Sequence, residues 1–282
     1  MAHSSAPHNL ADSLARDLAA MSVMFTEKPG MDERAAEKAW REKHCIPESY
    51  KKSLPYPTKF LHSALFGAAD KRRPRRTLVN QKLTCSSGGH FVYTGTELRQ
   101  DDETVLLCLL GTIRGRVAAS TIRFQPRDVC REIAWANGPH SVTRLKASLS
   151  RMLGSKIEAF DAEGELYWGT GLVHEFSCLP GAEWEVTLSA RLAWALHTKS
   201  TYFDMKVRQQ LAEGFDTWMY GWVKSNAGGF ATTLRKLAQV SGVNYAEPRD
   251  FKKRLRQTMN LLTELKVVEA WFIEDEELKY FK

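Results

Sequence analysis

Near its C-terminus this chain carries a basic stripe whose residue types suit the reading of DNA. At about 100° per residue, four polar side chains of this stretch fall within a helical sector roughly 60° wide, and apolar residues lie opposite. Arginine and asparagine can form paired hydrogen bonds with guanine and adenine, whereas lysine and serine more often hold phosphate. DNA contacts are therefore expected at Arg249, Lys252, Lys253, Arg256 and Asn260, of which all but Lys252 belong to the stripe.

A related stripe occurs about a hundred residues earlier. Its apolar side again repeats at helical spacing, and its polar side is expected to point outward. Either helix alone could be an ordinary surface helix, charged outside and apolar inside. The absence of compensating acids in both stripes favours a polyanionic partner instead. The expected DNA contacts of this earlier helix are Arg144, Lys146, Ser148 and Arg151.

Each stripe lies within the same order of expected elements: a short amphipathic helix, a turn, the basic helix and a strand hairpin. This is the order of a winged helix-turn-helix. The turn is longer in the second copy, so the two copies need not dock alike. The elements of the first copy are expected at 129–134, 144–149 and 156–168, and those of the second at 233–238, 254–259 and 267–281.

Length and pattern together predict an α+β fold with two tandem winged helix-turn-helix domains behind a partly flexible N-terminal arm. The arm is expected at 1–60, the first domain at 61–195 and the second at 196–282. Three prolines within 47–57 predict a linker. Apolar residues at helical spacing over 202–224 predict one long helix that opens the second copy.

A basic run, KRRPRR, occupies 71–76 just before the first copy. It could be a solvated loop, a nuclear-localisation-like tract, or an arm that lies along DNA phosphates. The last interpretation is preferred because of its position, with contacts from Arg72, Arg73, Arg75 and Arg76. The strands expected after it flank SSGG at 86–89, and the acids at 101–103 then open a helix, where negative charge suits the positive helix end.

Composition excludes several classes of protein. The net charge of +7 and pI of about 9.1 favour a polyanionic partner. No apolar run long enough to span a membrane occurs, and the N-terminus lacks the pattern of a secretory signal. Five scattered cysteines without a CxxC pair support neither a zinc site nor a disulfide framework, and a reducing cytosol fits best.

No enzymatic site is expected. The chain lacks a GxxxxGK[ST] phosphate loop, and its eight histidines show no ligand spacing. Gly169 and Gly171 form a lone GTG, and His174-Glu175 lacks the second histidine of a zinc protease. No catalytic residue, cofactor or metal is therefore predicted, although the acids at 101–103 leave open a metal-dependent nuclease.

The stretch 62–110 resembles the TrfA family of plasmid replication initiators. The shared elements are SALF at 63–66, Pro74-Arg75, LVNQK at 78–82 and YTGTELRQDDE at 93–103. The C-terminal part, from HTK at 197–199 to VVEAWFIEDEEL at 267–278, is similar too, so the likeness covers roughly 60–282.

That resemblance implies a bacterial cytoplasmic protein that binds directly repeated origin sites, called iterons, in double-stranded DNA. It further implies opening of an adjacent AT-rich region, binding of the exposed single strand, and recruitment of the host initiator, helicase and sliding clamp. It implies a monomer–dimer equilibrium in which the monomer is active. The rival interpretation is a winged-helix transcription regulator that binds a palindromic operator.

The family also carries an N-terminal pentapeptide of the QLSLF type that docks on the sliding clamp. The nearest match here is 21–25, MSVMF, in which the leading glutamine is missing. Met24 and Phe25 could still fill an apolar pocket. The same two residues equally fit the end of an amphipathic helix.

Overall fold

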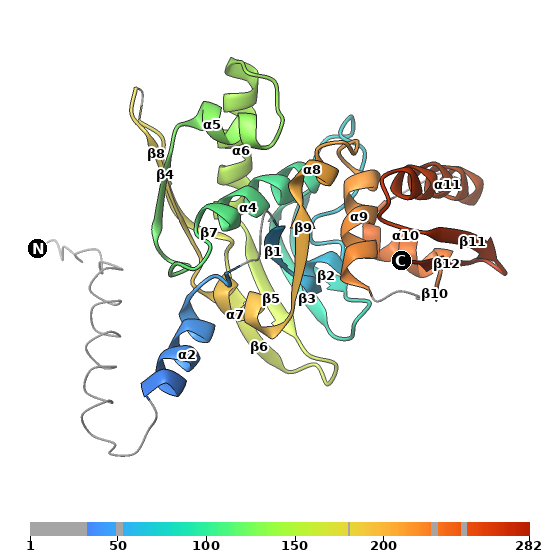
Figure 1. The fold of residues 1–282 in the computed structure, drawn as a ribbon, viewed down its shortest axis with the longest axis horizontal. Coiled ribbons are helices and arrows are strands. Elements are labelled where there is room, and N and C mark those ends of the chain that lie inside the picture. Colours follow the sequence, from blue (N-terminus) through green and yellow to red (C-terminus); the bar gives the residue numbers. More distant parts are fainter. Residues whose placement is uncertain (1–32, 49–52, 180, 227–230, 244–246) are drawn as a thin grey trace, which may run out of the picture.

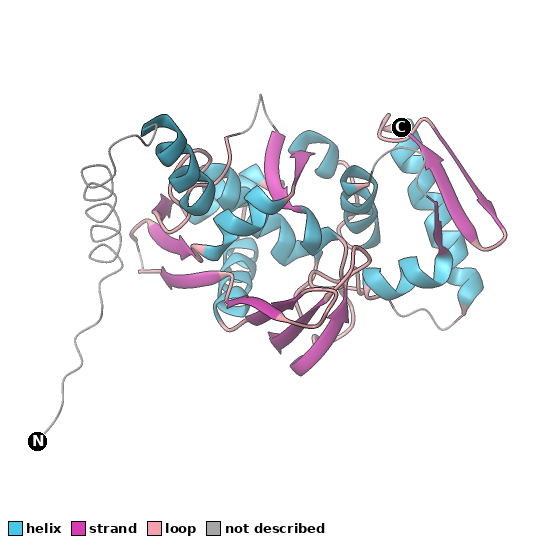
Figure 2. Ribbon diagram, turned by 90° about the horizontal axis from the view of Figure 1, so that it is seen from below, coloured by secondary structure: helices cyan, strands magenta, loops and turns pink. Residues whose placement is uncertain are grey.

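Helices and small antiparallel sheets alternate along the chain, so the fold is mixed α/β. The computed structural model describes residues 33–48, 53–179, 181–226, 231–243 and 247–282. Helix α2 (Glu33–His44) packs against α7 (Arg191–Thr198) at one end of the molecule. The C-terminal hairpin and α11 (Pro248–Glu264) lie at the other end (Figures 1 and 2).

Apart from an additional hairpin at 156–170 in the first, two parts of the chain contain the same order of elements: helix, strand, helix, helix and a closing hairpin. In each, the lone strand pairs with the last strand of the hairpin, which gives the sheet orders β4-β8-β7 and β10-β12-β11. The first unit consists of α4 (Gln100–Thr112), β4 (Thr121–Phe124), α5 (Pro126–Glu132), α6 (Pro139–Leu153), β7 (Val173–Ser177) and β8 (Trp184–Leu188). The second unit consists of α9 (Phe215–Ser225), β10 (Ala231–Thr233), α10 (Leu234–Ser241), α11, β11 (Ala270–Glu274) and β12 (Glu277–Phe281).

The hairpin expected at 156–168 forms, but in a different place from the hairpin that closes the second unit. Its strands β5 (Lys156–Phe160) and β6 (Leu166–Thr170) join β2 (Thr77–Thr84) and β3 (His90–Thr96) in a four-stranded sheet of order β2-β3-β5-β6. Ile157 and Ala159 are fully buried, because alternate residues of β5 face the core. The strands of the first unit that match 267–281 are therefore β7 and β8, and the expectation that 156–168 does so is wrong.

The expected linker at 47–57 is in part a strand. Residues Ser53–Pro57 form β1, which pairs antiparallel with β9 (Ser200–Asp204) in a two-stranded ribbon. Prolines are tolerated there because, among the described residues, neither strand of the ribbon has a second neighbouring strand that needs the missing N–H group. Tyr56 and Phe203 are fully buried with their rings 5.9 Å apart. This strand and the short helix α3 (Thr58–Leu61) after it contribute Tyr56 and Phe60 to the core, so residues 53–60 of the expected arm are part of the core.

The long helix expected over 202–224 is interrupted. Residues of β9 lead into the short helix α8 (Met205–Arg208), and α9 begins only at Phe215. Gly214, which precedes α9, has a φ of 121°, a value that glycine adopts far more readily than other residues. Phe203 fits the helical spacing of the sequence but lies in a strand, where it is buried while its neighbour Tyr202 is 40% exposed.

Candidate nucleic-acid interface

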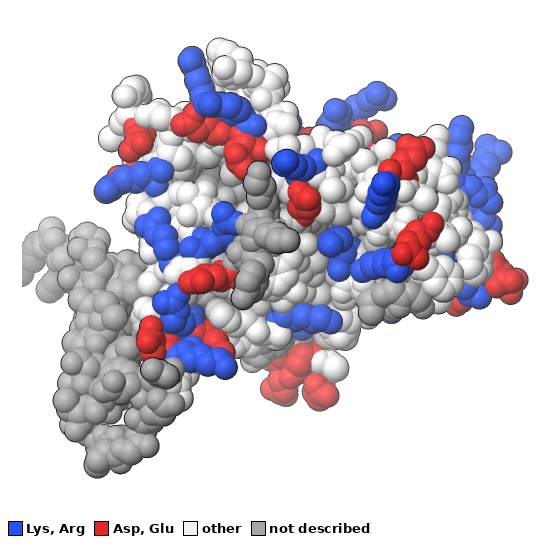
Figure 3. All heavy atoms as spheres, viewed as in Figure 1, with Lys and Arg blue, Asp and Glu red and all other residues white. Residues whose placement is uncertain are grey.

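Helix α11 presents the polar face that its sequence predicts. Its buried side is apolar, with Leu255, Met259 and Leu262 fully buried. The opposite side faces solvent, and a group of basic residues lies at the α11 end of the molecule (Figure 3). The expected stripe is confirmed as an exposed surface, and Gln257 adds to it. Its exposed members are Arg249, Lys253, Arg256 and Asn260.

Lys252 lies outside this stripe and has a partner. Its ammonium group is 2.5 Å from Glu276 in the turn between β11 and β12. The side chain is only 29% exposed. This ion pair connects the helix to the hairpin, so Lys252 is less available to phosphate than the residues of the stripe.

Helix α6 is rotated relative to the expectation. Ser148 is fully buried, and the side chains of Arg144 and Arg151 are 30% and 15% exposed. The expected outward stripe of Arg144, Ser148 and Arg151 is therefore wrong, because these residues face the start of α4. Lys146 is exposed as expected. The exposed residues that flank it on the outer face of α6 are Thr143 and Ser150.

The inward side chains of α6 converge on Asp102, whose side chain has no solvent exposure. Its carboxylate accepts hydrogen bonds from Ser148 Oγ at 2.7 Å and from Arg151 Nη2 at 2.7 Å. Arg75 Nη1 donates to the same group at 2.8 Å, and the backbone N–H of Arg99 donates at 2.9 Å. A buried carboxylate thus accepts five hydrogen bonds from four residues, since Arg151 also donates through Nε at 3.1 Å.

The neighbouring Asp101 balances the remaining positive charge. Arg75 Nη2 lies 2.6 Å from its carboxylate, and Arg144 lies at 3.3 Å. Burial acts to raise the pKa of Asp101, but Arg75 and then Arg144 outweigh it and hold that pKa below its usual value. Burial, followed by the charge of Asp101, raises the pKa of Asp102. The interpretation of the first stripe as basic without compensating acids is therefore wrong.

The second unit repeats this arrangement. Asp216, in the first turn of α9, is 4% exposed and accepts a hydrogen bond from Thr258 of α11. Arg254 Nη2 lies 2.7 Å from the same carboxylate. Arg254 and Thr258 are four residues apart in α11, as Arg144 and Ser148 are in α6. In each unit the first turn of the first helix accepts the hydroxyl and pairs with the arginine four residues before it, through Asp216 alone in the second unit and through Asp102 and Asp101 in the first.

This shared anchor aligns the two helices residue by residue. Superposing Arg144 and Ser148 on Arg254 and Thr258 places the outer residues in corresponding positions. The outer face of α11 carries three cations and that of α6 carries one, so the two units are alike in construction and unequal in charge. The corresponding outer residues are Thr143 with Lys253, Lys146 with Arg256, and Ser150 with Asn260.

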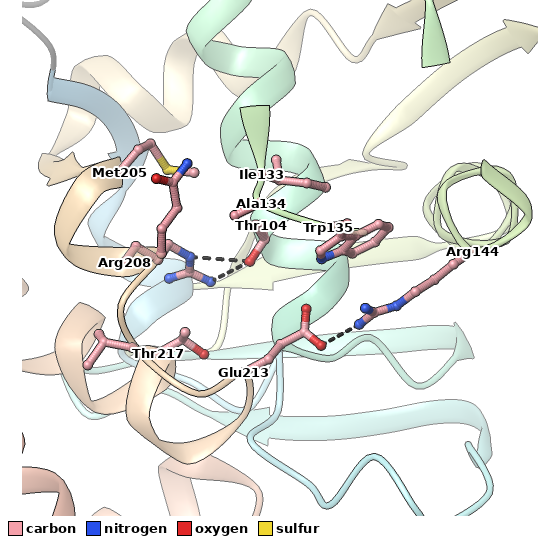
Figure 4. Close-up of a pocket in the computed structure, with 11 residues that line it drawn as sticks. Thr104, Ile133, Ala134, Trp135, Arg144, Met205, Arg208, Glu213 and Thr217 are labelled. Carbon is pink, nitrogen blue, oxygen red and sulfur yellow. Dashed lines mark hydrogen bonds and ion pairs between the residues drawn. The ribbon is translucent and has the colours of Figure 1, made fainter. Parts of the chain in front are cut away.

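Arg144 also reaches the segment that leads into the second unit. In Figure 4 its guanidinium points at Glu213, which precedes α9, and the two form an ion pair. The guanidinium carbon lies 4.0 Å from the centre of the Trp135 ring, within the range of a cation–π contact. These contacts hold Arg144 against the joint between the units.

A second connection between the units is buried. Arg208 of α8 is 2% exposed, and its Nη2 lies 2.7 Å from Glu103 of α4. The same guanidinium donates to Thr104, as Figure 4 shows, and to Gln100. Burial raises the pKa of Glu103, and the charge of Arg208 opposes that shift. Since breaking a buried pair is costly, α4 and α8 are held in one relative position.

The loop at 71–76 divides its cations between two environments. Arg75 is bound to Asp101 and Asp102, and Arg76 lies 2.9 Å from Glu97 although its side chain is 69% exposed. Arg72 and Arg73 are exposed and form no ion pair with any acid in the described part of the chain. The expected contact residues Met24 and Phe25 lie outside the described residues.

The acids at 101–103 are occupied by arginines rather than left open. Within the described residues, no group of three or more His, Cys, Asp or Glu side chains is arranged to hold a metal ion. In the same residues, no helix is both long and apolar enough to cross a membrane. Sequence reasoning missed Glu213, Asp216 and Arg208, although the repeated spacing of Arg144–Ser148 and Arg254–Thr258 was a usable signal.

The sequence pattern of the TrfA protein family matches residues 47–281. The chain belongs to the TrfA family. One relative is the plasmid replication initiator protein TrfA of Escherichia coli, 29% identical over 126 residues. The match covers 44% of this chain and 33% of that relative, so it spans about a third of the relative's length.

Solved structures of RctB domains 2 and 3 share the fold of this TrfA-family chain. A selenomethionine form of those domains has a TM-score of 0.55 at 10% identity, covering 80% of this chain and 98% of that one. A second structure of RctB domains 2–3 has a TM-score of 0.52, also at 10% identity, covering 78% and 95%. At this identity the likeness concerns the fold.

The motif that carries the TrfA resemblance builds the centre of the first unit. Within 93–103, Glu97 and Arg99 pair with each other at 2.7 Å and hold the 71–76 loop. Asp101 and Asp102 hold α6, and Glu103 holds α8. This short stretch of a TrfA-family sequence therefore positions the basic loop at 71–76, helix α6, and helix α8, which leads into the second unit.

Proposed function

We propose that this protein is a plasmid replication initiator that binds directly repeated origin sites and acts in the bacterial cytoplasm. The observation that carries the proposal is the internal repeat, in which two units each present the outer face of α6 or α11. The order of elements in both units supports two winged helix-turn-helix domains, with β7–β8 and β11–β12 as the wings. The E. coli relative of the family is named as a plasmid replication initiator.

Each helix would enter a major groove, and the two grooves would lie about one helical turn apart on one side of the duplex. In α11 the proposed contacts are Arg249, Lys253, Arg256 and Asn260, with Lys252 as a weaker phosphate contact. In α6 the proposed contact is Lys146, and Thr143 and Ser150 replace the buried residues of the original expectation. Arg72, Arg73 and Arg76 are the proposed contacts of the loop.

The inequality of the two outer faces favours directly repeated sites. Two unlike units in one chain read two unlike sequences, so one protein recognises an asymmetric site. A transcription regulator that reads a palindrome uses a two-fold dimer of identical units. The active form is accordingly proposed to be the monomer, with domains at 61–195 and 196–282 and with β1 as an N-terminal contribution to both.

Further steps follow from the resemblance to the family. The protein would open an adjacent AT-rich region with binding energy and DNA deformation, at steps that unstack easily. It would then bind the exposed single strand and recruit the host initiator, helicase and sliding clamp. A Met24→Ala, Phe25→Ala variant that bound the clamp as well as the parent would exclude the clamp-docking role of 21–25.

Selection of bound DNA from a random pool and from plasmid fragments tests the main proposal. We expect direct repeats beside an AT-rich stretch, and affinity that falls by about 0.9 log units per neutralised phosphate for each log unit of salt. Selection of an inverted repeat would favour the regulator instead. Failure to enrich any duplex sequence would reject both.

A further inference from the structure

The basic loop at 71–76, which precedes β2, lies between α6 and α11, the two helices whose outer faces are proposed to contact DNA. On one side, Arg75 donates to Asp102, which also holds Ser148 and Arg151 of α6. On the other side, a groove of about 990 Å³ is shared by the loop and the first turns of α11, where Arg254 contributes to the wall. Figure 1 shows the loop at the upper edge of the molecule, between α6 and α11. The loop therefore lies between the two helices that carry the proposed major-groove contacts.

The loop has a fixed backbone. Arg99 is 5% exposed, and its guanidinium donates to three carbonyl groups of the loop backbone. Its acceptors are the carbonyl oxygens of Asp70 at 3.0 Å, Arg73 at 2.9 Å and Pro74 at 3.0 Å. The side chain of Asp70 accepts the backbone N–H of Arg72 at 2.9 Å, which closes a turn. One buried arginine thus holds the turn that presents the others.

The tip of this turn carries cations that form no side-chain ion pair within the described part of the chain. Lys71, Arg72 and Arg73 are all exposed. Among the described acids nearby, Asp70 accepts the backbone N–H of Arg72, Glu97 pairs with Arg76 and Arg99, and Asp101 pairs with Arg75. A turn with a fixed backbone that carries two adjacent guanidinium groups loses little backbone freedom when it meets a ligand.

We propose that Arg72 and Arg73 enter the DNA minor groove between the two major grooves that α6 and α11 occupy, and that they read its width. This inference rests on the proposed function. Two successive major grooves on one face of a duplex are separated by one minor groove, and the loop lies between the two helices proposed to enter those major grooves. A narrow, A·T-rich minor groove has a strongly negative potential and attracts arginine. Arginine suits it better than lysine because its guanidinium is less strongly hydrated.

The consequence is a sequence preference at base pairs that neither helix touches. Guanine places its 2-amino group in the minor groove, whereas A·T pairs present only acceptors there. G·C pairs in the spacer should therefore weaken binding, by roughly tenfold for a fully replaced spacer. Replacement by inosine·C pairs, which lack that amino group, should restore most of the affinity.

The first experiment uses the full chain and a selected duplex with an A·T, G·C or inosine·C spacer. Dimethyl sulfate reports both grooves at once, since it methylates guanine N7 in the major groove and adenine N3 in the minor groove. We expect protection of N7 in two flanking grooves and of N3 in the spacer. Protection of N7 at both flanks with indifference to the spacer would overturn the inference and leave the proposed function standing. Absence of the two N7 footprints would overturn both.

Variants separate groove insertion from simple phosphate attraction. Arg72→Ala with Arg73→Ala should abolish N3 protection and the spacer preference, while both N7 footprints remain. Arg72→Lys with Arg73→Lys keeps the charge, so full recovery of the preference would identify a phosphate contact and reject insertion. Lys43→Ala with Lys82→Ala removes the same charge from exposed sites outside the loop and should keep the preference. Thermal unfolding of each variant checks that the fold is retained.

Discussion

Thr258 of α11 donates a hydrogen bond to Asp216 in the first turn of α9, so a hydroxyl of the outer helix is used inside the unit. Ser148 of α6 makes the corresponding contact with Asp102 at 2.7 Å. Each contact sets the rotation of its helix about its own axis. The rotation decides which residues face outward, so these two hydroxyls determine the composition of the outer surface without belonging to it.

Removal of these hydroxyls should lower stability. Thr258→Val and Ser148→Ala each leave a buried carboxylate short of a donor, at a cost of about 1–3 kcal/mol in the free energy of unfolding. Urea denaturation measures the loss. Ser150→Ala, on the exposed side of α6, is the matched control and should change stability by less than about 0.5 kcal/mol. Equal effects of Ser148→Ala and Ser150→Ala would contradict the assigned rotation of α6.

Two arginines of α11 should respond in opposite ways. Arg256 is exposed, so Arg256→Ala should cost about 1–3 kcal/mol of specific binding and relax the preference at one base pair, with the unfolding transition unchanged. Arg254 pairs with Asp216, so Arg254→Ala should lower stability before it affects DNA contacts. Fluorescence titration with the selected duplex, beside thermal unfolding, distinguishes the two. A stable Arg254→Ala variant that lost base preference would reverse the assignment.

The buried pair between Arg208 and Glu103 should show strong coupling. Arg208→Met leaves Glu103 buried without its partner and should cost about 3–5 kcal/mol. Adding Glu103→Gln removes the stranded charge and should recover a large part of that loss. A double-mutant cycle in urea measures the coupling energy. Purely additive losses would show that the pair does not connect the two units.

Acid should weaken the fold through His62. Burial, followed by the charges of Lys199 and Lys236, lowers the pKa of His62 from 6.5 to about 4. Between these values the unfolded chain binds the proton and the folded chain does not, so the contribution is fully present above pH 6.5 and is lost as pH falls toward 4. The loss amounts to about 3 kcal/mol. His62→Gln should flatten this part of the stability profile between pH 7 and 4, and His140→Gln, at an exposed position, should keep the wild-type slope.

Local patterns were sufficient to predict the closing hairpin of the second unit, the β2–β3 hairpin and the start of α4. The acids at 101–103 and Pro126 act within one turn of helix, so their effect does not depend on the rest of the fold. The outer face of α11 was also predictable, since polar and apolar residues lie on opposite sides of this helix. The exposed residues of α11 that confirm this are Arg249, Lys253, Arg256 and Asn260.

Features that depend on distant partners were not predictable in this way. The strand at Ser53–Pro57 exists because β9 lies beside it, and the two are far apart in sequence. Ser148 was expected outside because it shares a helical stripe with Arg144 and Arg151, but Asp102, 46 residues earlier, provides a buried acceptor. One residue of a helix corresponds to about 100° of rotation. The contact of Ser148 with Asp102 therefore turns the side of α6 that carries Arg144, Ser148 and Arg151 toward the core, opposite to the expectation.

The pairing of β1 with β9 closes the molecule on itself. Strand β1, which precedes the first unit, pairs with β9, which precedes the second unit, so the ribbon lies outside both units and connects the segments that lead into them. A single cut in the chain between the units would leave both fragments joined through this ribbon and the buried Arg208–Glu103 pair. If the two halves were produced separately, divided at position 195, one would lack β9 and Arg208, and the other would lack β1 and Glu103. Each half would then expose surface that is buried in the whole chain, so the two units together form the smallest fragment in which these contacts are complete.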